Sequence, residues 1–429
     1  MIFSYLNALA QKYNKTSLIA RICVGLVCGT VLGIVLPGAQ VIALLGELFV
    51  GALKGIAPLL VFLLIASSLA QKHARLDRRF GLVVLLYIAS TLLASFVAVA
   101  GSFLFPQTIV LAQSADVASA APKGIGEVLR NLLMNAVSNP VASVASANYI
   151  GILAWAAMFG LALKKSSSET TRRLFSDVAD GCSHIVRLII NLAPFGILGL
   201  VFSTISQNGL SVFRTYGSLV LLIACSMAAV VLVVEPLIIW IALRKNPYPL
   251  VFRCLRESGI TAFFTRSSAA NIPINMALCE KLGLDRNFYS VSIPLGATIN
   301  MDGAAVTIAV MTLAAARTLG ISVDVPTALF LSVLATFGAC GASGVAGGSL
   351  LLIPMACSLF GISDDISMQV VGMGFVIGVV QDSLETALNS SGDAMLTATA
   401  EYVQWRRDGR ALPKRLGDPA EQAPQEQPS

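Results

Sequence analysis

Side chains with oxygen atoms recur at helical spacing near the C-terminus. Asp382, Asn389 and Asp393 are separated by seven and four residues, which places them on one narrow stripe of a helix, with Glu385 about one turn from Asp382. Carboxylate and amide oxygens, without histidine or thiolate, suit a small hard cation such as sodium. The stripe therefore predicts cation binding.

A second polar group interrupts an apolar stretch upstream, at Asn300-Met301-Asp302-Gly303. This segment predicts a broken helix, whose exposed carbonyl oxygens could join side-chain oxygens in replacing the hydration shell of an ion. Three hydroxyl groups fall within about one helical turn earlier in the chain, at Tyr87, Ser90 and Thr91. They either contribute to such a site or serve ordinary helix packing.

The composition places these residues in a membrane. Of 429 residues, 56% are hydrophobic and 12% are charged, which is not the balance of a soluble domain. Carboxylates at membrane depth are costly and usually functional, although a structural ion pair is the alternative for any single one. Six apolar stretches reach the ~20 residues of a membrane-crossing helix, at residues 18–36, 41–70, 80–105, 141–163, 185–206 and 217–243.

The basic residues predict the orientation of these spans. With a cytoplasmic N-terminus, 22 of the 29 Lys and Arg residues fall inside and four fall outside, as the positive-inside rule requires. The first apolar run is longer than the ~7–15 residues of a signal-peptide core, which favours a retained helix over a cleaved signal. The net charge of +6 is dispersed through loops, so no nucleic-acid partner is expected.

Cysteine and histidine usage argues against zinc and disulfide chemistry. The eight cysteines are single, with no C-x-x-C pair, and are expected to be small buried hydrophobes. His73 and His184 are the only histidines, so a zinc motif is absent and Ser267 or Ser268 would lack a histidine base in a hydrolase.

After Pro247 every apolar run is interrupted. Arms of ~12 residues reach ~18 Å, about half of a bilayer, so two runs are expected to enter the membrane and return. The runs are 257–280, with a polar tip at 265–271, and 326–360, with a glycine-rich tip at 341–349. Each precedes a helix with polar residues in mid-span, at 286–313 and 366–400. Paired interruptions in oppositely oriented halves indicate a transporter; close helix packing is the alternative reason for the glycines alone.

The sequence resembles the dicarboxylate/amino acid:cation symporter family over residues 15–400, and within it the bacterial sodium/serine-threonine branch. The motifs that carry the resemblance are Gly296-Ala297-Thr298-Ile299-Asn300-Met301-Asp302-Gly303, Arg266-Ser267-Ser268, the 343–349 tip and Asn389-Ser390-Ser391-Gly392-Asp393. The resemblance implies an all-α polytopic membrane protein with eight transmembrane helices and two re-entrant helical hairpins. Inverted repeats and a homotrimer are features of the family, so they follow from the resemblance alone.

The resemblance also divides the chain into three parts. Residues 1–245 would form six spans of scaffold and transport-associated helices, and 246–402 the transport core of two hairpins, broken helix seven and helix eight. Residues 403–429 would be a cytoplasmic tail, expected to be disordered after Pro413 because it is rich in Pro, Gln and Glu. The expected location is the bacterial cytoplasmic (inner) membrane, with both termini in the cytoplasm.

The resemblance implies three sodium positions. The first would use Asp393, Asn389 and backbone oxygens near Gly296 and Asn300. The second would lie between Thr298, Met301 and the second hairpin tip. The third would use Tyr87, Ser90, Thr91, Asn300 and Asp302.

The substrate would lie between the two tips. Its carboxylate would meet groups near Ser268 and Asn389, and its ammonium group would meet Asp382. The expected contacts are Ser267, Ser268, Val345, Ser349, Asp382, Glu385 and Asn389.

Two positions differ from the family members that carry acidic substrates. Those members have an arginine where this chain has Glu385, and a threonine where it has Ala304. Two desolvated like charges 4 Å apart repel by about 4 kcal/mol at an effective dielectric constant near 20, which disfavours aspartate, glutamate and C4-dicarboxylates. Glu385 could instead pair with Arg266 or accept a hydrogen bond from a substrate hydroxyl.

The sequence thus predicts sodium-coupled import of small neutral amino acids, serine and threonine first, by an elevator-type mechanism without covalent chemistry. The protein would be a secondary transporter, with the lipid bilayer, sodium and the amino acid as partners. A proton- or sodium-coupled carrier of acidic amino acids or C4-dicarboxylates in the same family is the alternative. An intramembrane hydrolase and a channel remain as other classes.

Overall fold

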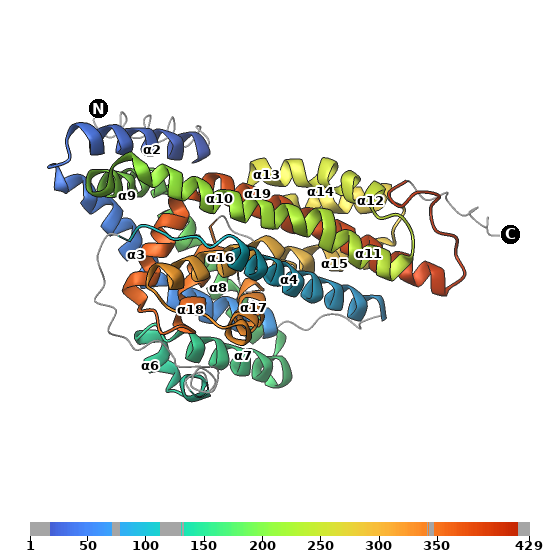
Figure 1. Cartoon of the computed structure of the whole chain (residues 1–429). Helices are drawn as coiled ribbons and strands as arrows, with labels where there is room; N and C mark the ends of the chain where they lie inside the picture. Colours follow the sequence, from blue (N-terminus) through green and yellow to red (C-terminus); the bar gives the residue numbers. More distant parts are fainter. Residues whose placement is uncertain are drawn as a thin grey trace, which may run out of the picture.

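The computed structural model describes residues 18–70, 78–111, 130, 133–340, 342 and 347–418, and its regular structure there is helical (Figure 1). A helix satisfies its backbone hydrogen bonds internally, which a bilayer requires because it offers no water in its core. The expected all-α class is confirmed.

The described residues of the first half include nine α-helices. These are α2 (Leu18–Val35), α3 (Ala43–Ala70), α4 (Arg78–Leu104), α6 (Pro140–Ala145), α7 (Tyr149–Ser166), α8 (Glu169–Asn191), α9 (Ala193–Asn208), α10 (Val212–Ala229) and α11 (Glu235–Leu243). Between them lie η1 (Gln40–Ile42), η2 (Gly209–Ser211) and η3 (Val230–Val234), of which η3 is a π-helical turn.

The second half contains shorter helices and one very long one. These are α12 (Tyr248–Cys254), the π-helical turn η4 (Leu255–Gly259), α13 (Ile260–Thr265), α14 (Ser268–Lys281), α15 (Arg286–Ile299), α16 (Asp302–Thr318), α17 (Val325–Ala339), η5 (Ser349–Leu352), α18 (Ile353–Ser358) and α19 (Asp364–Arg407).

Two of the six predicted spans are not continuous helices. The span predicted at 185–206 is divided at Leu192, where α8 and α9 bend by 54°. Pro194 stands in the first turn of α9 and lacks the N–H that a continuing helix needs. The span predicted at 141–163 is divided between α6 and α7, where Ala147 has a φ of 54° and Asn148 caps the next helix.

Length and hydropathy identify five described segments that could cross a membrane, or six if α8 and α9 form one bent span. The five are Gln40–Ser67, Arg78–Leu104, Phe213–Leu243, Arg286–Thr318 and Asp364–Arg407. Three shorter apolar helices accompany them: Ala20–Val35, Val325–Ala339 and Ser349–Ser358. This is a multi-pass helical protein, although length alone does not yield eight crossings.

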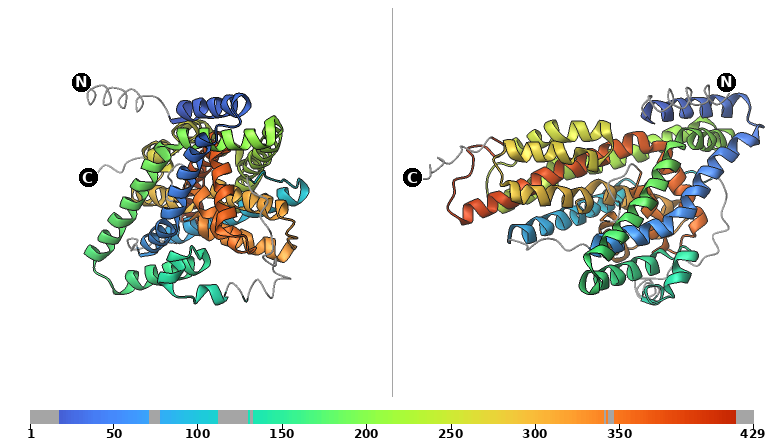
Figure 2. Two further views of the ribbon diagram at one scale, coloured as in Figure 1. Left: turned by 90° about the vertical axis from the view of Figure 1, so that its left-hand side faces the viewer. Right: turned by 180° about the vertical axis from the view of Figure 1, so that it is seen from behind.

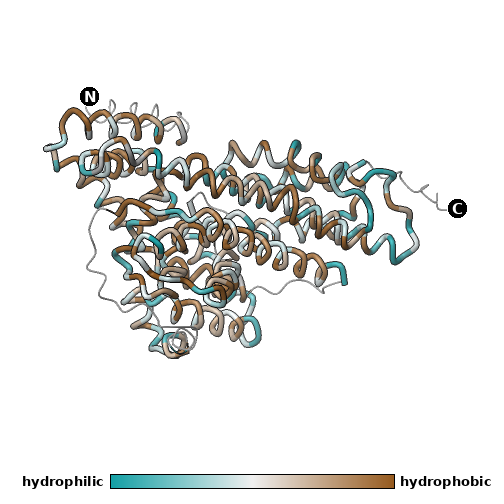
Figure 3. The backbone as a smooth tube through the Cα atoms, in the orientation of Figure 1, coloured by the Kyte–Doolittle hydropathy of each residue, from teal (hydrophilic) through white to brown (hydrophobic). Residues whose placement is uncertain are grey.

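The crossing segments differ in how far protein encloses them. In the most apolar window of Arg286–Thr318, 94% of the residues are buried, and in that of Asp364–Arg407 78% are buried. The corresponding share is 39–50% for the three segments of the first half. Helix α19 accordingly runs through the middle of the molecule (Figure 2), and apolar residues also cover the outer helices (Figure 3). Protein therefore encloses these two segments of the second half more completely than the three segments of the first.

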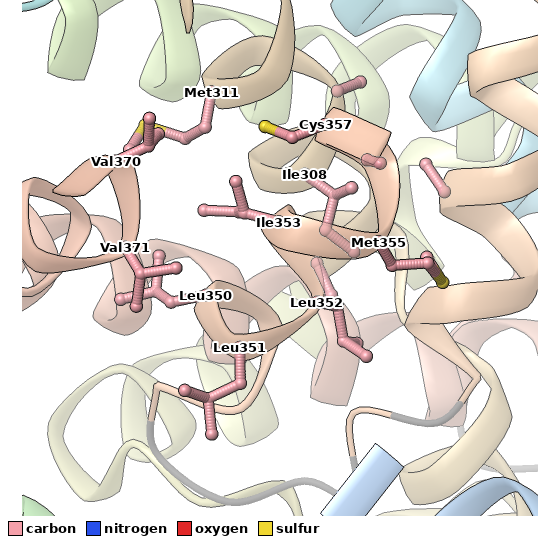
Figure 4. Close-up of a cluster of buried hydrophobic side chains, with 14 of the residues drawn as sticks. Ile308, Met311, Leu350, Leu351, Leu352, Ile353, Met355, Cys357, Val370 and Val371 are labelled. Atoms are coloured by element: carbon pink, nitrogen blue, oxygen red, sulfur yellow. The ribbon is translucent and has the colours of Figure 1, made fainter. Parts of the chain in front are cut away.

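The returning arm of the second interrupted run, formed by η5 and α18, lies in a buried apolar cluster. Side chains from α16, from η5 and α18, and from α19 gather there, among them Ile308, Leu350, Ile353 and Val371 (Figure 4). The returning arm of the second interrupted run is thus packed between α16 and α19, which places this arm beside the polar residues of both helices.

The C-terminal segment corrects one expectation. Residues 414–418 were expected to be disordered, but Leu416 is 1% exposed and Gly417 lies against Pro249 and Leu250. Lys245 donates to the carbonyl of Pro413 at 2.9 Å, and Arg253 donates to the carbonyl of Gly417. One buried leucine therefore anchors a segment whose composition is polar. Residues 419–429 lie outside the described residues.

Candidate functional site

The predicted broken helix is present. Between α15 and α16, Asn300 has φ −92° and ψ 81°, and Met301 has φ −119° and ψ 52°, both outside the helical region. Such a break leaves the last carbonyl groups of α15 without intrahelical donors. It faces α19 closely, because a Cβ on Gly303 would lie 2.7 Å from the Cα of Glu385.

Asn389 and Asp393 of α19 bind this break directly. The N–H of Gly303 donates to Asn389 Oδ1 at 2.7 Å, and Asn389 Nδ2 lies 3.4 Å from Met301 Sδ. Asn300 Nδ2 donates to Asp393 Oδ1 at 3.1 Å and to the carbonyl of Asn389 at 3.2 Å. Two segments far apart in the sequence therefore form one polar cluster.

The hydroxyl groups of α4 complete the cluster. Ser90 and Thr91 both donate to the carboxylate of Asp302, Thr91 at 2.8 Å. The Tyr87 hydroxyl lies 3.2 Å from the carbonyl oxygen of Asp393 and 2.8 Å from Thr397 Oγ1. These hydroxyls contact the polar cluster, so they do more than fill space between helices.

Of two further predicted ion contacts, one belongs to the polar cluster and one does not. Gly296 belongs to the cluster, because a Cβ there would lie 2.7 Å from Asp393 Oδ1 and 2.8 Å from the Tyr87 hydroxyl. Thr298 does not: its side chain is exposed and its hydroxyl donates to the carbonyl of Leu295 at 2.7 Å. The second-tip residues 343–346, which the predicted second sodium position needs, lie outside the described residues.

Arg266 forms the tip of the first interrupted run. It has a φ of 52°, a left-handed conformation that ends α13, and the Ser267 hydroxyl then caps α14 by accepting from the N–H of Ala270. Ser267 is therefore a capping residue and does not line the cavity described below. Arg266 Nε lies 2.7 Å from Asp382 Oδ2, with both side chains largely buried. This ion pair replaces the possible pair between Arg266 and Glu385.

The second oxygen of Asp382 binds the other interrupted run. The N–H of Gly347 donates to Asp382 Oδ1 at 3.2 Å. Gly347 has a φ of 71°, which favours glycine, and a Cβ there would lie 2.8 Å from the ring of Phe375. Asp382 thus joins both runs in this structure.

Glu385 accepts hydrogen bonds from three elements. Its Oε2 accepts from Thr307 of α16 at 3.0 Å, from Ser349 of η5 at 2.8 Å, and from Gln381 of α19. The residue is 6% exposed. Sequence reasoning missed Thr307 and Gln381, although a polar residue one turn before Glu385 and a threonine one turn after Gly303 were visible signals.

A small cavity of about 10 Å³ opens beside these residues, which is room for about one water molecule. The predicted substrate contacts Ser268, Asp382, Glu385 and Asn389 line it, together with Arg266, Met301, Ala342 and Thr386. Ser349 does not line it but binds Glu385, and Val345 lies outside the described residues. Four of the predicted substrate contacts therefore surround one point, next to the polar cluster.

Two further polar groups near α19 escaped sequence analysis. Asn271 and Asn275 of α14 bind Ser390 of α19, at 2.7 Å and 2.9 Å, and Asn271 also binds Ser258. Glu235 of α11 is fully buried and lies beside Gly392. A lone carboxylate within the apolar stretch 217–243 was its available signal.

The donor set suits a hard cation. Asp302 and Asp393 are fully buried, and the ion pairs of the described residues include neither. Asp393 Oδ2 and Asn300 Oδ1 have no hydrogen-bond partner there. No group of three His, Cys, Asp or Glu side chains that could hold a metal ion occurs within the described ranges. Buried charges and acceptors without donors are stabilised by a cation that oxygen ligands hold.

Comparison with known proteins identifies the family. The model of the sodium:dicarboxylate symporter family matches residues 18–402. The chain belongs to this family. The match spans the broken helix, both interrupted runs and the polar stripe, so the site of this sodium:dicarboxylate symporter family member lies within the shared region.

Individual relatives are similar over nearly the whole chain. The Serine/threonine transporter SstT of Bifidobacterium adolescentis is 60% identical over 407 residues, covering 95% of this chain and 94% of the relative. Those of Streptococcus thermophilus and Streptococcus agalactiae are 55% and 57% identical, covering 92% and 91% of this chain and 98% and 97% of theirs. These family members are all called transporters.

Proposed function

We propose that this protein is a secondary transporter that imports serine and threonine together with sodium. The observation that carries the proposal is the meeting of the α15–α16 break with Asn389 and Asp393 beside a cavity lined by Asp382 and Glu385. Ion ligands and substrate groups thus share α19, and the similarity to serine/threonine transporters supports the same cargo. Cation and amino acid would each tighten the binding of the other.

Sodium is the proposed driving ion. Asp393, Asn300 and Asn389 would hold one ion with carbonyl oxygens near Gly296, and Asp302 would hold another with Tyr87, Ser90 and Thr91. A tenfold sodium gradient supplies ~1.4 kcal/mol, and a potential of 100 mV adds ~2.3 kcal/mol for each charge. One sodium ion could therefore sustain several-hundred-fold accumulation of a neutral amino acid.

Asp382 and Glu385 would select the substrate. The ammonium group would replace Arg266 at Asp382, and the side-chain hydroxyl of serine or threonine would donate to Glu385. Because Glu385 repels a second carboxylate, acidic substrates are disfavoured. The cavity of about 10 Å³ is too small for an amino acid, so Gly347 and Ser349 of the second run would have to move away from Asp382 and Glu385 to admit one.

The proposed membrane architecture adds the number of spans, the two hairpins and the oligomeric state to the helical, multi-pass fold described above. It has eight spans and two re-entrant hairpins in inverted repeats, with 246–402 as the moving core, and it assembles as a homotrimer in the bacterial cytoplasmic membrane with both termini inside. Helices α4 and α11 pack on α16 or α19, and Ser90 and Thr91 bind Asp302. We therefore assign α4 and the continuous span of α10, η3 and α11 to the moving unit, as transport-associated helices of the region 1–245.

Uptake of radiolabelled serine into proteoliposomes tests the proposal. An inward sodium gradient should drive accumulation above the external concentration, and threonine should compete, with alanine weaker and aspartate ineffective. Replacing sodium by choline should abolish accumulation.

Two results would overturn this function. Absence of accumulation under a sodium gradient would exclude sodium coupling. Strong competition by aspartate, with uptake driven by a proton gradient, would instead establish the acidic-substrate carrier of the same family.

A further inference from the structure

Glu235 is a buried carboxylate that the proposed ion and substrate contacts do not use. It begins α11, and its side chain is 0% exposed. Neither of its oxygens has a hydrogen-bond partner among the described residues. The ion pairs of the described residues do not include it either. An isolated buried carboxylate is expensive unless a cation or a proton neutralises it.

Gly392 shows where this carboxylate points. A Cβ on Gly392 would lie 2.5 Å from Glu235 Oε1 and 2.8 Å from Asn300 Nδ2. Both groups therefore border the same point, and the missing side chain of Gly392 is what allows them to approach. Asp393 follows Gly392 in α19 and accepts from that same Asn300 Nδ2 at 3.1 Å.

Several oxygens of these three residues lack donors. Glu235 Oε1 and Oε2, Asn300 Oδ1 and Asp393 Oδ2 are all buried without a hydrogen-bond partner among the described residues. Two carboxylates and one amide on adjoining elements thus offer unpaired hard oxygen ligands. Such a set favours a cation over further protein contacts.

The backbone before Glu235 is also unusual. The π-helical turn η3 ends directly before it, and the N–H of Glu235 donates to the carbonyl of Val230, five residues earlier. Pro236 follows and has no N–H to donate. A π-helical turn changes the direction of the side chains after it and occurs often at functional sites. This turn explains how an otherwise apolar helix presents a carboxylate to α19.

We propose that Glu235 is a ligand of a transported monovalent cation, sodium in the first instance, which it binds together with Asp393 and Asn300. The inference rests on the proposed sodium-coupled function and adds a ligand from α11 to it. The carboxylates of Glu235, Asp302 and Asp393 are three negative charges in one buried region, and bound cations offset them. The bound ion also joins α11 to α15 and α19.

Equilibrium binding of radioactive sodium to the purified full-length protein tests this assignment without any transport step. Sodium alone is the probe, and choline chloride keeps the ionic strength constant. Glu235→Gln should lose one sodium ion per chain or bind sodium about tenfold more weakly, because a charged ligand is replaced by a neutral one. Glu401→Gln is the control: Glu401 is also buried, but it binds the N–H of Asp285 and Trp405 Nε1, away from the cluster.

Unchanged sodium stoichiometry and affinity in Glu235→Gln would overturn the assignment. That result would mean that Glu235 is protonated and binds no ion, because an amide has the same shape as a protonated carboxyl group. Wild-type protein without saturable sodium binding would instead overturn the proposed function. If Glu235→Gln does not give a monodisperse protein, Glu235→Asp and Gly392→Ala replace it. Both should weaken sodium binding, the second because its methyl group occupies the space between Glu235 and Asn300, and wild-type binding in both would refute the assignment.

Discussion

Glu385 contributes a carboxylate to the lining of the proposed substrate cavity, and its Oε2 already accepts hydrogen bonds from Thr307 and Ser349. The charge serves two purposes in the proposed mechanism. It holds η5 against α16 and α19, and it offers an acceptor to a substrate hydroxyl. The two roles predict different affinities for alanine relative to serine. Alanine lacks the hydroxyl, so it loses only the second role.

Glu385→Gln should therefore reduce the preference for serine over alanine by about tenfold or more, because a site that hydrogen-bonds a hydroxyl discriminates against an analogue without it. The inhibition constants of the two amino acids against serine uptake measure this ratio. Ser349→Ala is the matched control: it removes one donor to Glu385 and should weaken both amino acids equally. An unchanged ratio in Glu385→Gln would show that the carboxylate only positions η5.

Individual residues were predictable where their chemistry stood out from an apolar context. Asp302, Asn389 and Asp393 lie together at the break between α15 and α16, as predicted. Polar groups at membrane depth face the protein interior and one another, and helical spacing puts Asn389 and Asp393 on one face. Glu385 was one possible partner of Arg266, whereas the structure pairs Arg266 with Asp382; the two acidic residues are three apart and share a helix face, so spacing does not distinguish them. Glu235 was overlooked because it stood alone, and only the π-helical turn brings it to α19.

Helix α14 is attached to α19 by buried amides rather than by apolar packing alone. Asn271 and Asn275 both bind Ser390, and all three are fully buried. Inside a membrane protein such bonds orient helices because few other donors and acceptors compete for them.

Ser390→Ala should lower the free energy of unfolding by about 1–2 kcal/mol, because it removes the hydroxyl that accepts from Asn271 Nδ2 at 2.7 Å and from Asn275 Nδ2 at 3.2 Å. The bond from Asn275 to the Ser390 carbonyl remains. Thermal unfolding in detergent measures the loss. Ser391→Ala is the neighbouring control, since the Ser391 hydroxyl bonds only to carbonyls of its own helix. Equal stability of the two variants would contradict a docking role for Ser390.

Breaks between elements were predictable when polar residues caused them. The Asn300–Met301 break and the Arg266 tip follow from clustered amide, hydroxyl and charged residues at membrane depth. The bend at Leu192 was missed because its cause, Pro194, lies within an otherwise ordinary apolar stretch, and a proline in a membrane helix is compatible with either a kink or a break.

For the whole molecule, composition correctly indicated a membrane protein whose second half carries the polar interior. The expectation of disorder after Pro413 was wrong for residues 414–418. Composition averages over all residues of a segment, whereas the burial of the single residue Leu416 holds this segment against the protein. Residues 408–418 lead from the end of α19 to the start of α12, which they contact through Leu416 and Gly417. This contact connects the end of α19 to the beginning of the first interrupted run.

Leu416→Ala should destabilise the protein by about 2 kcal/mol, because it removes a fully buried side chain and leaves a cavity. Thermal unfolding of the full-length protein would detect the shift. Arg415→Ala is the control, since Arg415 is exposed beside it. Identical unfolding of the two variants would contradict an anchoring role for Leu416.

Helix α19 has 44 residues without a break, so its length is about 66 Å, roughly twice the hydrocarbon thickness of a bilayer. It carries the proposed ion ligands Asn389 and Asp393 in its middle, and residues 408–418 follow at its end. A displacement of the ligands relative to the membrane would be transmitted undiminished to that end. The depth of a single label there would report the position of a buried ion site that no soluble reagent can reach.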